Sequence, residues 1–249
     1  MTDTHPLDNP VFAALTGEQA RFALRYRNAV RYRPGVSPFG AVADETSAGD
    51  WADAARLTGA GQVTLFVRSS AAPPDDWEVV GGRPGVQLVA EDLDPAPDPE
   101  AIALTAADVP EMLELTERTK PGPFLPGTVE LGGYLGIRRD GRLVAMAGER
   151  MRPPGFAEIS AVCTDQGWRG HGFGARLTRA VAAGIVARGE TPFLHAAGDN
   201  VDAIRLYKSL GFTHRRDVAF VATRPPRATS ELTGVFRRHC RIIASRNNL

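Results

Sequence analysis

The sequence predicts a mixed α/β fold, that is, an α+β mixed sheet with a smaller α+β unit ahead of it. Residues 159–212 alternate a short apolar strand, a glycine-rich turn, an amphipathic helix, a second strand and a second helix. Upstream, Asp140–Gly141 separates two apolar runs in the manner of a β-hairpin turn. A strand–helix–strand unit beside a hairpin favours a mixed sheet covered by helices.

The composition limits the class of protein. With 249 residues, 43% of them hydrophobic, the chain can form one large domain or two smaller ones around a sizeable core. Its formal net charge is zero, which gives no general attraction to nucleic acid or to an anionic membrane. The two cysteines, Cys163 and Cys240, do not suggest a disulfide framework. The first residues lack the basic and apolar regions of a signal peptide, and no apolar run approaches the roughly 20 residues of a membrane span. We therefore expect a soluble, cytoplasmic protein with no nucleic-acid or membrane partner and no metal.

The first third of the chain mixes helix and strand patterns and has no glycine nest. Thr16 is a plausible N-cap with Gln19 three residues on, which predicts a helix containing Phe22, Leu24 and Val30. The following patterns predict a strand at 37–44, a helix at 51–57 and strands at 63–68, 77–80 and 85–90.

A proline-rich, acidic segment predicts the domain boundary. Asp92–Glu100 holds three prolines and four acids in nine residues, a composition that favours an extended linker. The predicted organisation is an N-terminal domain at 1–91, a linker at 92–100, a main domain at 101–224 and a basic tail at 225–249.

The main domain begins with a strand at 101–104 and a helix capped by Asp108 that runs to about Arg118. Lys120–Gly127, rich in proline and glycine, cannot be regular structure. A hairpin at 133–148 follows, and then a strand at 157–164. Along this strand we expect Glu158, Ser160, Val162 and Thr164 to share one face.

The glycine loop is the strongest chemical signal. Gly170, Gly172 and Gly174 alternate with larger residues where a helix begins. Residues without Cβ let the backbone approach a ligand closely, and the first turn of a helix offers unpaired N–H groups and a positive dipole end. The loop therefore predicts a site for phosphate groups.

Other phosphate motifs fit less well. Gly170-x-Gly172-x-x-Ala175 formally matches the dinucleotide fingerprint, and Asp199 could serve as its ribose acid. That fingerprint should follow its strand directly, yet Asp165–Arg169 intervene, and the chain has too few strand–helix repeats for a doubly wound sheet. No Gly-Lys-Ser/Thr follows the glycines, which excludes a nucleotide P-loop.

Two motifs together resemble a known family. Arg169-x-x-Gly172-x-Gly174 is similar to the Arg/Gln-x-x-Gly-x-Gly/Ala signature of the GNAT acyltransferase superfamily, and Asn200 with Tyr207–Phe212 looks like its second motif. The resemblance covers about residues 99–224. Within the superfamily, Asp199–Tyr207 is similar to the subgroup that includes glycine N-acyltransferase C-terminal domains. Tandem GNAT-like halves occur in that subgroup, so a degenerate copy is one interpretation of the N-terminal domain.

This resemblance implies an N-acetyltransferase that moves an acetyl group by direct transfer from acetyl-CoA to a primary amine of a small-molecule or peptide acceptor. By the same resemblance Tyr207 protonates the coenzyme A thiolate, and the proline-rich loop after the first helix borders the acceptor pocket. Glu158 is our candidate base, with Glu149 and His195 as rivals. The residues expected to meet coenzyme A are Val162, Cys163, Thr164, Arg169, Gly170, His171, Gly172, Phe173, Gly174, Ala175 and Asn200.

Alternatives remain open at this point. A non-catalytic acyl-CoA-binding or sensing module, in which the N-terminal unit blocks the acceptor site, is the second hypothesis, and a dinucleotide-dependent enzyme is the third. The identity of the acceptor and the oligomeric state do not follow from the sequence.

Overall fold

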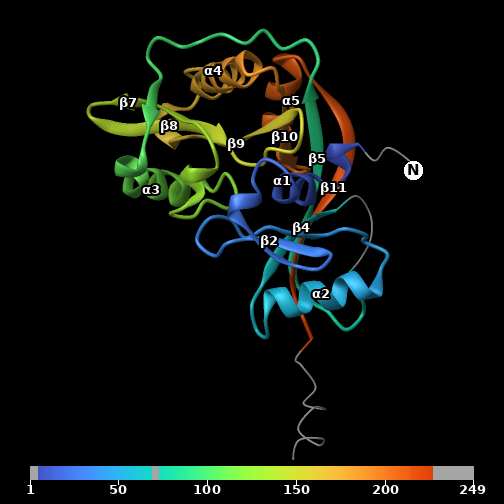
Figure 1. Ribbon diagram of the computed structural model, residues 1–249. Helices are drawn as coiled ribbons and strands as arrows, with labels where there is room; N and C mark the ends of the chain where they lie inside the picture. Colours follow the sequence, from blue (N-terminus) through green and yellow to red (C-terminus); the bar gives the residue numbers. More distant parts are fainter. Residues whose placement is uncertain (1–4, 69–72, 227–249) are drawn as a thin grey trace, which may run out of the picture.

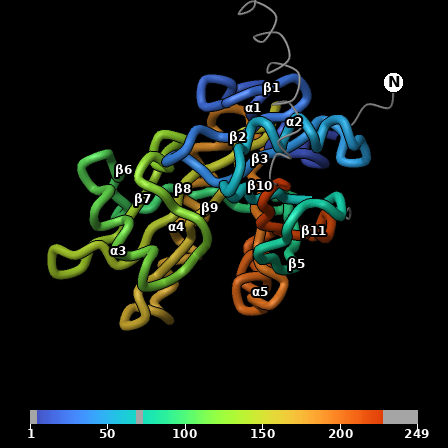
Figure 2. The backbone as a smooth tube through the Cα atoms, turned by 90° about the horizontal axis from the view of Figure 1, so that it is seen from below, coloured from blue at the N-terminus to red at the C-terminus, as the bar shows by residue number. Residues whose placement is uncertain are grey.

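The computed structural model describes residues 5–68 and 73–226, so the basic tail predicted at 225–249 lies outside the described residues from 227 on. Its centre is an eight-stranded mixed sheet, which confirms the predicted fold class. Figure 2 shows β6 and β7 at one end of this sheet and β5 and β11 toward the other. In spatial order the strands are β4 (Thr64–Arg68), β11 (Phe212–Arg224), β5 (Glu78–Ala90), β10 (Thr191–Ala197), β9 (Phe156–Thr164), β8 (Arg142–Glu149), β7 (Tyr134–Arg139) and β6 (Ile102–Leu104).

Helices cover both faces of the sheet (Figure 1). The helices α4 (Phe173–Ala187) and α5 (Val201–Ser209) lie on one face, whereas α3 (Val109–Thr119) and the N-terminal elements lie on the other. Neighbouring residues of β10 show the division, because side chains alternate along a strand. Leu194 belongs to the cluster that contains the apolar side chains of α4, and Phe193 belongs to the cluster formed with the N-terminal segment.

The N-terminal elements form a three-stranded sheet with two helices. The strands are β1 (Ala23–Tyr26), β2 (Ala29–Tyr32) and β3 (Gly40–Val42), and the helices are α1 (Pro10–Thr16) and α2 (Ala48–Thr58).

The helix predicted to begin after Thr16 is wrong, because Thr16 ends α1 and a β-hairpin follows. Arg27 turns the hairpin with a φ of 47°, and Tyr32 becomes fully buried on β2. Gln19 does not cap a helix. Its buried amide donates to the carbonyl oxygens of Leu131 and Arg150 and accepts from the Tyr32 hydroxyl. Long-range pairing thus overrides the local capping pattern.

The main sheet is continuous across the predicted domain boundary. The two strands predicted at 77–80 and 85–90 form one strand, β5, which pairs with β11 along its length and with β10 from Gly85 to Val89. Pro84 lies just beyond the β10 pairing, where its missing N–H costs no ladder bond to β10. The division into separate domains stays a prediction, and any such division leaves β4 and β5 in the same sheet as the main unit.

The acidic segment 92–100 crosses over α4 on its way from β5 to β6 (Figure 1). The Arg176 guanidinium donates to both Asp98 oxygens, at 2.6 and 2.8 Å, and to Glu100 at 2.6 Å. One turn further, Arg179 pairs with Asp94. This segment is therefore extended, as predicted, and is held against the helix by ion pairs.

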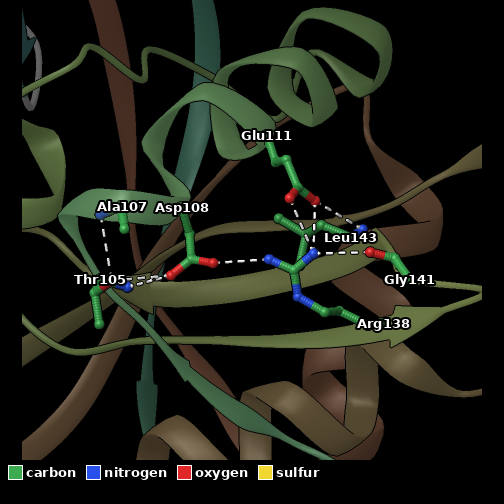
Figure 3. Close-up of polar contacts among 7 residues, drawn as sticks. All are labelled: Thr105, Ala107, Asp108, Glu111, Arg138, Gly141 and Leu143. Carbon is green, nitrogen blue, oxygen red and sulfur yellow. Dashed lines mark hydrogen bonds and ion pairs between the residues drawn. The ribbon is translucent and has the colours of Figure 1, made fainter.

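The start of α3 is anchored to the hairpin of β7 and β8 (Figure 3). Thr105 and Asp108 form a capping box ahead of the helix. The Arg138 guanidinium on β7 donates to Asp108 and Glu111 at 2.7 Å. The hairpin itself turns at Asp140 and Gly141, both with positive φ, which confirms the predicted Asp-Gly turn.

Candidate active site

A break between β9 and β10 opens the centre of the sheet. These two parallel strands pair at only three positions, Thr191–Phe193 with Phe156–Glu158. Beyond them β9 bulges: Gly148 pairs with Ser160 and Met146 with Cys163, so three steps on β9 face two steps on β8. Ala161 carries the bulge with a φ of 53°, an uncommon conformation for a residue with a side chain. The ends of β9 and β10 then line a common cavity.

The bulge also changes which side chains share a face. Since paired residues of neighbouring strands point to the same side, Glu158 and Ser160 share their face with Cys163. Val162 lies instead among the apolar side chains that pack under α4. The expectation that Glu158 and Val162 point the same way is therefore wrong, because one inserted residue inverts the alternation.

The cavity has a volume of about 1230 Å³ and passes through the sheet. On the α4 and α5 side it is lined by β9, the glycine loop and α5. On the opposite side it is lined by Phe39, Leu65, Gly81, Gly82, Arg83, Arg150, His195 and Phe220. Thr119–Pro123 also line it, which confirms the proline-rich loop as one cavity wall.

The glycine loop has the backbone geometry of an anion nest. Gly170 and Gly172 have φ values of 83° and 75°, and Gly172 is the N-cap of α4. No heavy atom lies within 4 Å of a Cβ built on either glycine. Glycine is thus required here by the backbone conformation, and the space beside it is free for a ligand.

His171 is the one predicted cofactor residue that does not line the cavity. Its ring is exposed, lies 5.7 Å from that of Phe173 and 5.5 Å from that of Trp168, and its Nδ1 is within 3.2 Å of two loop carbonyls. Trp168 lines the cavity although the sequence did not single it out.

The α5 wall carries the predicted acid. Asn200 caps this helix by accepting the Ala203 N–H, and Tyr207, further along the helix, is only 8% exposed. Burial, with a smaller effect of Cys163, raises the pKa of Tyr207 to about 12. Burial also raises the pKa of the Cys163 thiol to about 11. Both groups therefore hold their protons at neutral pH, so Tyr207 is available as a donor and Cys163 is a poor nucleophile.

A buried charge cluster lies behind the opposite wall. Glu158 is fully buried and accepts from Arg150 Nε and Nη2 at 2.8 and 2.7 Å and from His195 Nδ1 at 2.7 Å. Burial alone would raise the pKa of this carboxyl, but Arg150 and His195 lower it to about 2. Arg150 and His195 line the cavity, whereas Glu158 and its rival Glu149 do not.

The hydrogen bonds assign the tautomer of His195. Gln87 Oε1 accepts from Arg215, and Gln87 Nε2 donates to the Leu7 carbonyl, so the amide nitrogen is the atom that faces His195 Nε2 at 3.1 Å. Nε2 must accept this bond, and Nδ1 carries the proton that bonds Glu158. The lone pair of His195 is thus already engaged.

The site residues fit a phosphate-bearing thioester. The nest at the start of α4 suits phosphates, the open edge of β9 suits an amide-containing arm, and Tyr207 borders the break in the sheet. Among the described residues no group of three or more His, Cys, Asp or Glu side chains could hold a metal ion. No described helix is long and apolar enough to cross a membrane.

Comparison with known proteins identifies the chain as an acetyl-CoA-dependent N-acetyltransferase and names the family. The model of the FR47-like protein family matches residues 134–221. The chain is 36% identical over 121 residues to the N-alpha-acetyltransferase RimI of Mycobacterium tuberculosis, covering 44% of this chain and 75% of that one. It is 34% identical over 128 residues to a mycothiol acetyltransferase of Mycobacterium avium, covering 47% of this chain but only 40% of that relative.

Solved structures extend the likeness to the N-terminal region. A GNAT-family protein from Novosphingobium aromaticivorans is 42% identical with a TM-score of 0.83, and the match covers 90% of this chain and all of that one. A GCN5-related N-acetyltransferase from Kribbella flavida, 18% identical with a TM-score of 0.57 over 88% of this chain and 96% of that one, shares the fold. The chain belongs to the GNAT family of N-acetyltransferases.

The dinucleotide hypothesis does not fit the fold. Its doubly wound sheet needs a series of parallel strands, and β9 with β10 is the one parallel pair among the named strands of the described main sheet.

Proposed function

We propose that the protein transfers the acetyl group directly from acetyl-CoA to a primary amine of a small-molecule or peptide acceptor. The observation that carries this proposal is the cavity that passes through the break in the sheet, because it extends from the glycine loop on one face to Arg150 and Phe39 on the other. Two substrates that enter from opposite faces can meet where the strands part.

The glycine loop and β9 would hold acetyl-CoA, which supplies the activated thioester when bound. The N–H groups of Gly170–Ala175 and the side chain of Arg169 would hold the phosphates, and the backbone of Val162–Thr164 would pair with the pantetheine arm. Support comes from the free space beside Gly170 and Gly172 and from the left-handed backbone that both residues adopt.

In the chemical step a C–N bond forms between the acceptor amine and the acetyl carbonyl, and the C–S bond breaks. We propose that the Tyr207 hydroxyl donates its proton to the departing thiolate. Its burial on the cavity wall and its raised pKa support this role, since the hydroxyl stays protonated throughout the working pH range.

The amine must also lose a proton, and Glu158 remains our proposed base. The surroundings of Glu158 limit this role. The carboxylate is fully buried and has a pKa of about 2, and Arg150 and His195 separate it from the cavity. A proton from the cavity would have to pass these two side chains, and the lone pair of His195 is already bound to Gln87. A Glu158→Gln variant that keeps the pH profile of turnover would exclude Glu158 as the base.

We also propose kinship with the glycine N-acyltransferase subgroup, for which the support is the segment Asp199–Tyr207 at the start of α5. A panel of acyl-CoA chain lengths with glycine as acceptor tests this finer assignment. Use of acetyl-CoA alone, with no acyl transfer to glycine, would contradict the assignment to this subgroup. The reducing cytoplasm stays our predicted location, a setting that suits the buried free thiol of Cys163.

The test of the proposed function is thiol release from acetyl-CoA by the purified full chain with a panel of amino acids, polyamines and peptides, followed by mass spectrometry of the products. We expect amine-dependent thiol release and products heavier by one acetyl group. Tight coenzyme A binding without release for any amine would instead favour a binding or sensing module.

A further inference from the structure

The acceptor side of the cavity has an uneven charge distribution. On this face the cavity-lining charged residues are Arg83 and Arg150, with Lys120 on the adjoining loop. The acids among the described lining residues, Asp199 and Asp202, lie beside the N-terminus of α5 on the cofactor side. The described part of the acceptor wall therefore presents cations and no carboxylate.

Arg150 is the buried member of this set and has donors to spare. Its side chain is 8% exposed and uses Nε and Nη2 to bind both Glu158 oxygens. Nη1 forms no hydrogen bond with any described residue, although Arg150 lines the cavity. A guanidinium can hold one carboxylate on its Nε edge and a second on its Nη1–Nη2 edge. The free Nη1 edge of Arg150 can therefore donate hydrogen bonds to an anion in the cavity.

Arg150 is also held in place. Its guanidinium carbon lies 4.7 Å from the centre of the Phe39 ring, a stacked position, and the bonds to Glu158, which is itself bound to His195, fix its Nε edge. Phe39 itself comes from the N-terminal unit and reaches the sheet through a bridge with Leu65. An arginine that does not move on binding loses little conformational entropy when it pairs with a ligand.

Apolar side chains line the same side of the cavity as this donor. They are those of Phe39, Leu65 and Phe220. A ligand that fills this space would bury an apolar body next to a positively charged edge.

We infer that the acceptor is an amine that also carries a carboxylate and an apolar body, such as an apolar amino acid, and that Arg150 binds its carboxylate. This inference rests on the proposed function for the amine and adds the chemical class of the acceptor. A polyamine would place further positive charge beside Arg83 and Arg150 and would leave the free edge of Arg150 without an acceptor. A cationic wall also lowers the pKa of the bound amine, which favours its nucleophilic, neutral form.

The transfer experiment compares L-phenylalanine, L-phenylalaninamide and spermidine as acceptors for the full chain with acetyl-CoA. We expect kcat/KM for phenylalanine to exceed that for the amide by 10-fold or more, with spermidine the poorest of the three. The amine of the amide is the easier to deprotonate, so amine basicity cannot produce this preference. Equal values for the acid and the amide, or a preference for spermidine, would overturn the inference.

The variant Arg150→Lys keeps a positive charge opposite Glu158 but lacks the second hydrogen-bonding edge of the guanidinium. It should raise KM for phenylalanine by 10-fold or more and leave KM for the amide and for acetyl-CoA within about twofold. The matched control is Arg152→Lys, two residues further on, where the arginine pairs with Glu190 at 2.5 Å and does not line the cavity. Parallel losses for acid and amide in Arg150→Lys would mean that Arg150 acts only structurally, and would overturn the inference.

A binding experiment separates this inference from the proposed function. With coenzyme A present, calorimetry measures 3-phenylpropionate and 3-phenylpropionamide, neither of which can be acetylated on an amine. We expect the wild type to bind the acid at least 10-fold more tightly. This result with no transfer to any amine would retain the carboxylate site and refute the proposed function. Transfer to amines with equal binding of acid and amide would support the proposed function and refute the carboxylate site. Since both arms use the wild type, they decide the question even if Arg150→Lys does not fold.

Discussion

The cofactor wall and the acceptor wall of the same cavity are built in opposite ways. The cofactor wall comes almost entirely from one stretch, from Val162 on β9 through the glycine loop to Tyr207 on α5. The acceptor wall gathers Phe39, Leu65, Arg150 and Phe220 from four distant parts of the chain. The first wall can be encoded in a local motif, whereas the second depends on how the N-terminal unit packs on the sheet.

The matches to known proteins differ in how much of this chain they cover. RimI and mycothiol acetyltransferase match less than half of this chain, while the GNAT protein from Novosphingobium aromaticivorans matches 90% of it. The family model spans residues 134–221, which include the cofactor wall together with Arg150 and Phe220, whereas Phe39 and Leu65 lie outside it. This difference is consistent with an acceptor pocket that is specific to chains with such an N-terminal unit, and each prediction below tests one of the two walls.

The largest expected effect concerns the buried pair behind the acceptor wall. The pKa of Glu158, about 2, lies below its ordinary value of 4.5, so the folded protein gains stability above pH 4.5 that is lost as the pH falls toward 2. The difference corresponds to roughly 3 kcal/mol in all, of which roughly 2 kcal/mol is lost by pH 3.

Urea unfolding between pH 7 and pH 3 measures this loss. The double variant Arg150→Met/Glu158→Gln removes both charges and should show a correspondingly flatter dependence on pH. Glu114→Gln, whose side chain is 73% exposed, should behave like the wild type. Identical pH dependence in the wild type and the double variant would show that Glu158 is not the stabilising group.

The next effect belongs to the cofactor wall. Tyr207→Phe keeps the ring beside Phe212 and removes only the hydroxyl, so stability and coenzyme A affinity should change little. Turnover should fall by roughly 10²-fold, because the proton is needed only as the C–S bond breaks.

Steady-state kinetics and calorimetry on the same preparation check this prediction. Tyr134→Phe is the control, since that hydroxyl is buried without a partner among the described residues and does not line the cavity. Intact turnover with weakened coenzyme A binding in Tyr207→Phe would reassign Tyr207 to cofactor binding.

A smaller effect is expected in the nest. Gly172→Asp places a carboxylate where the phosphates should lie, in a residue with a φ of 75°, and should weaken coenzyme A binding by an order of magnitude or more. Gly141→Asp imposes the same backbone strain at a φ of 77° in the hairpin turn, away from the cavity. Calorimetry should show a loss for Gly172→Asp only. Equal affinities in the two folded variants would contradict the phosphate nest.

The smallest effect concerns the segment between the two predicted domains. Arg176 is 32% exposed, so its pairs with Asp98 and Glu100 should contribute less than about 1 kcal/mol. Arg176→Met should nevertheless speed proteolytic cleavage within 92–100, because these bonds hold the segment against α4. Arg205→Met, which removes an exposed pair on α5, is the control. First cleavage inside 159–212 in the wild type would contradict the predicted boundary.

The turns and caps predicted around the glycine loop match the structure because their signals are local. The alternating glycines, the Asn200 cap and the Asp140–Gly141 turn each depend on residues a few positions apart, and each has the expected backbone geometry. The helix predicted after Thr16 also rested on a local signal, a capping pattern. It is wrong because the packing of Tyr32 and Gln19 against distant segments overrides that pattern.

The sequence by itself determined the fold class, the glycine-rich turn ahead of α4 and the position of Tyr207 on α5, because glycine conformation and helix periodicity act over short distances. Only the tertiary structure decided that β5 runs unbroken through the sheet, that the bulge at Ala161 turns Glu158 away from Val162, and that Arg150 stacks on Phe39 at the cavity wall. These features depend on pairings between residues far apart in the chain, whose free energy comes from burial and strand register and leaves no mark in any short stretch of sequence.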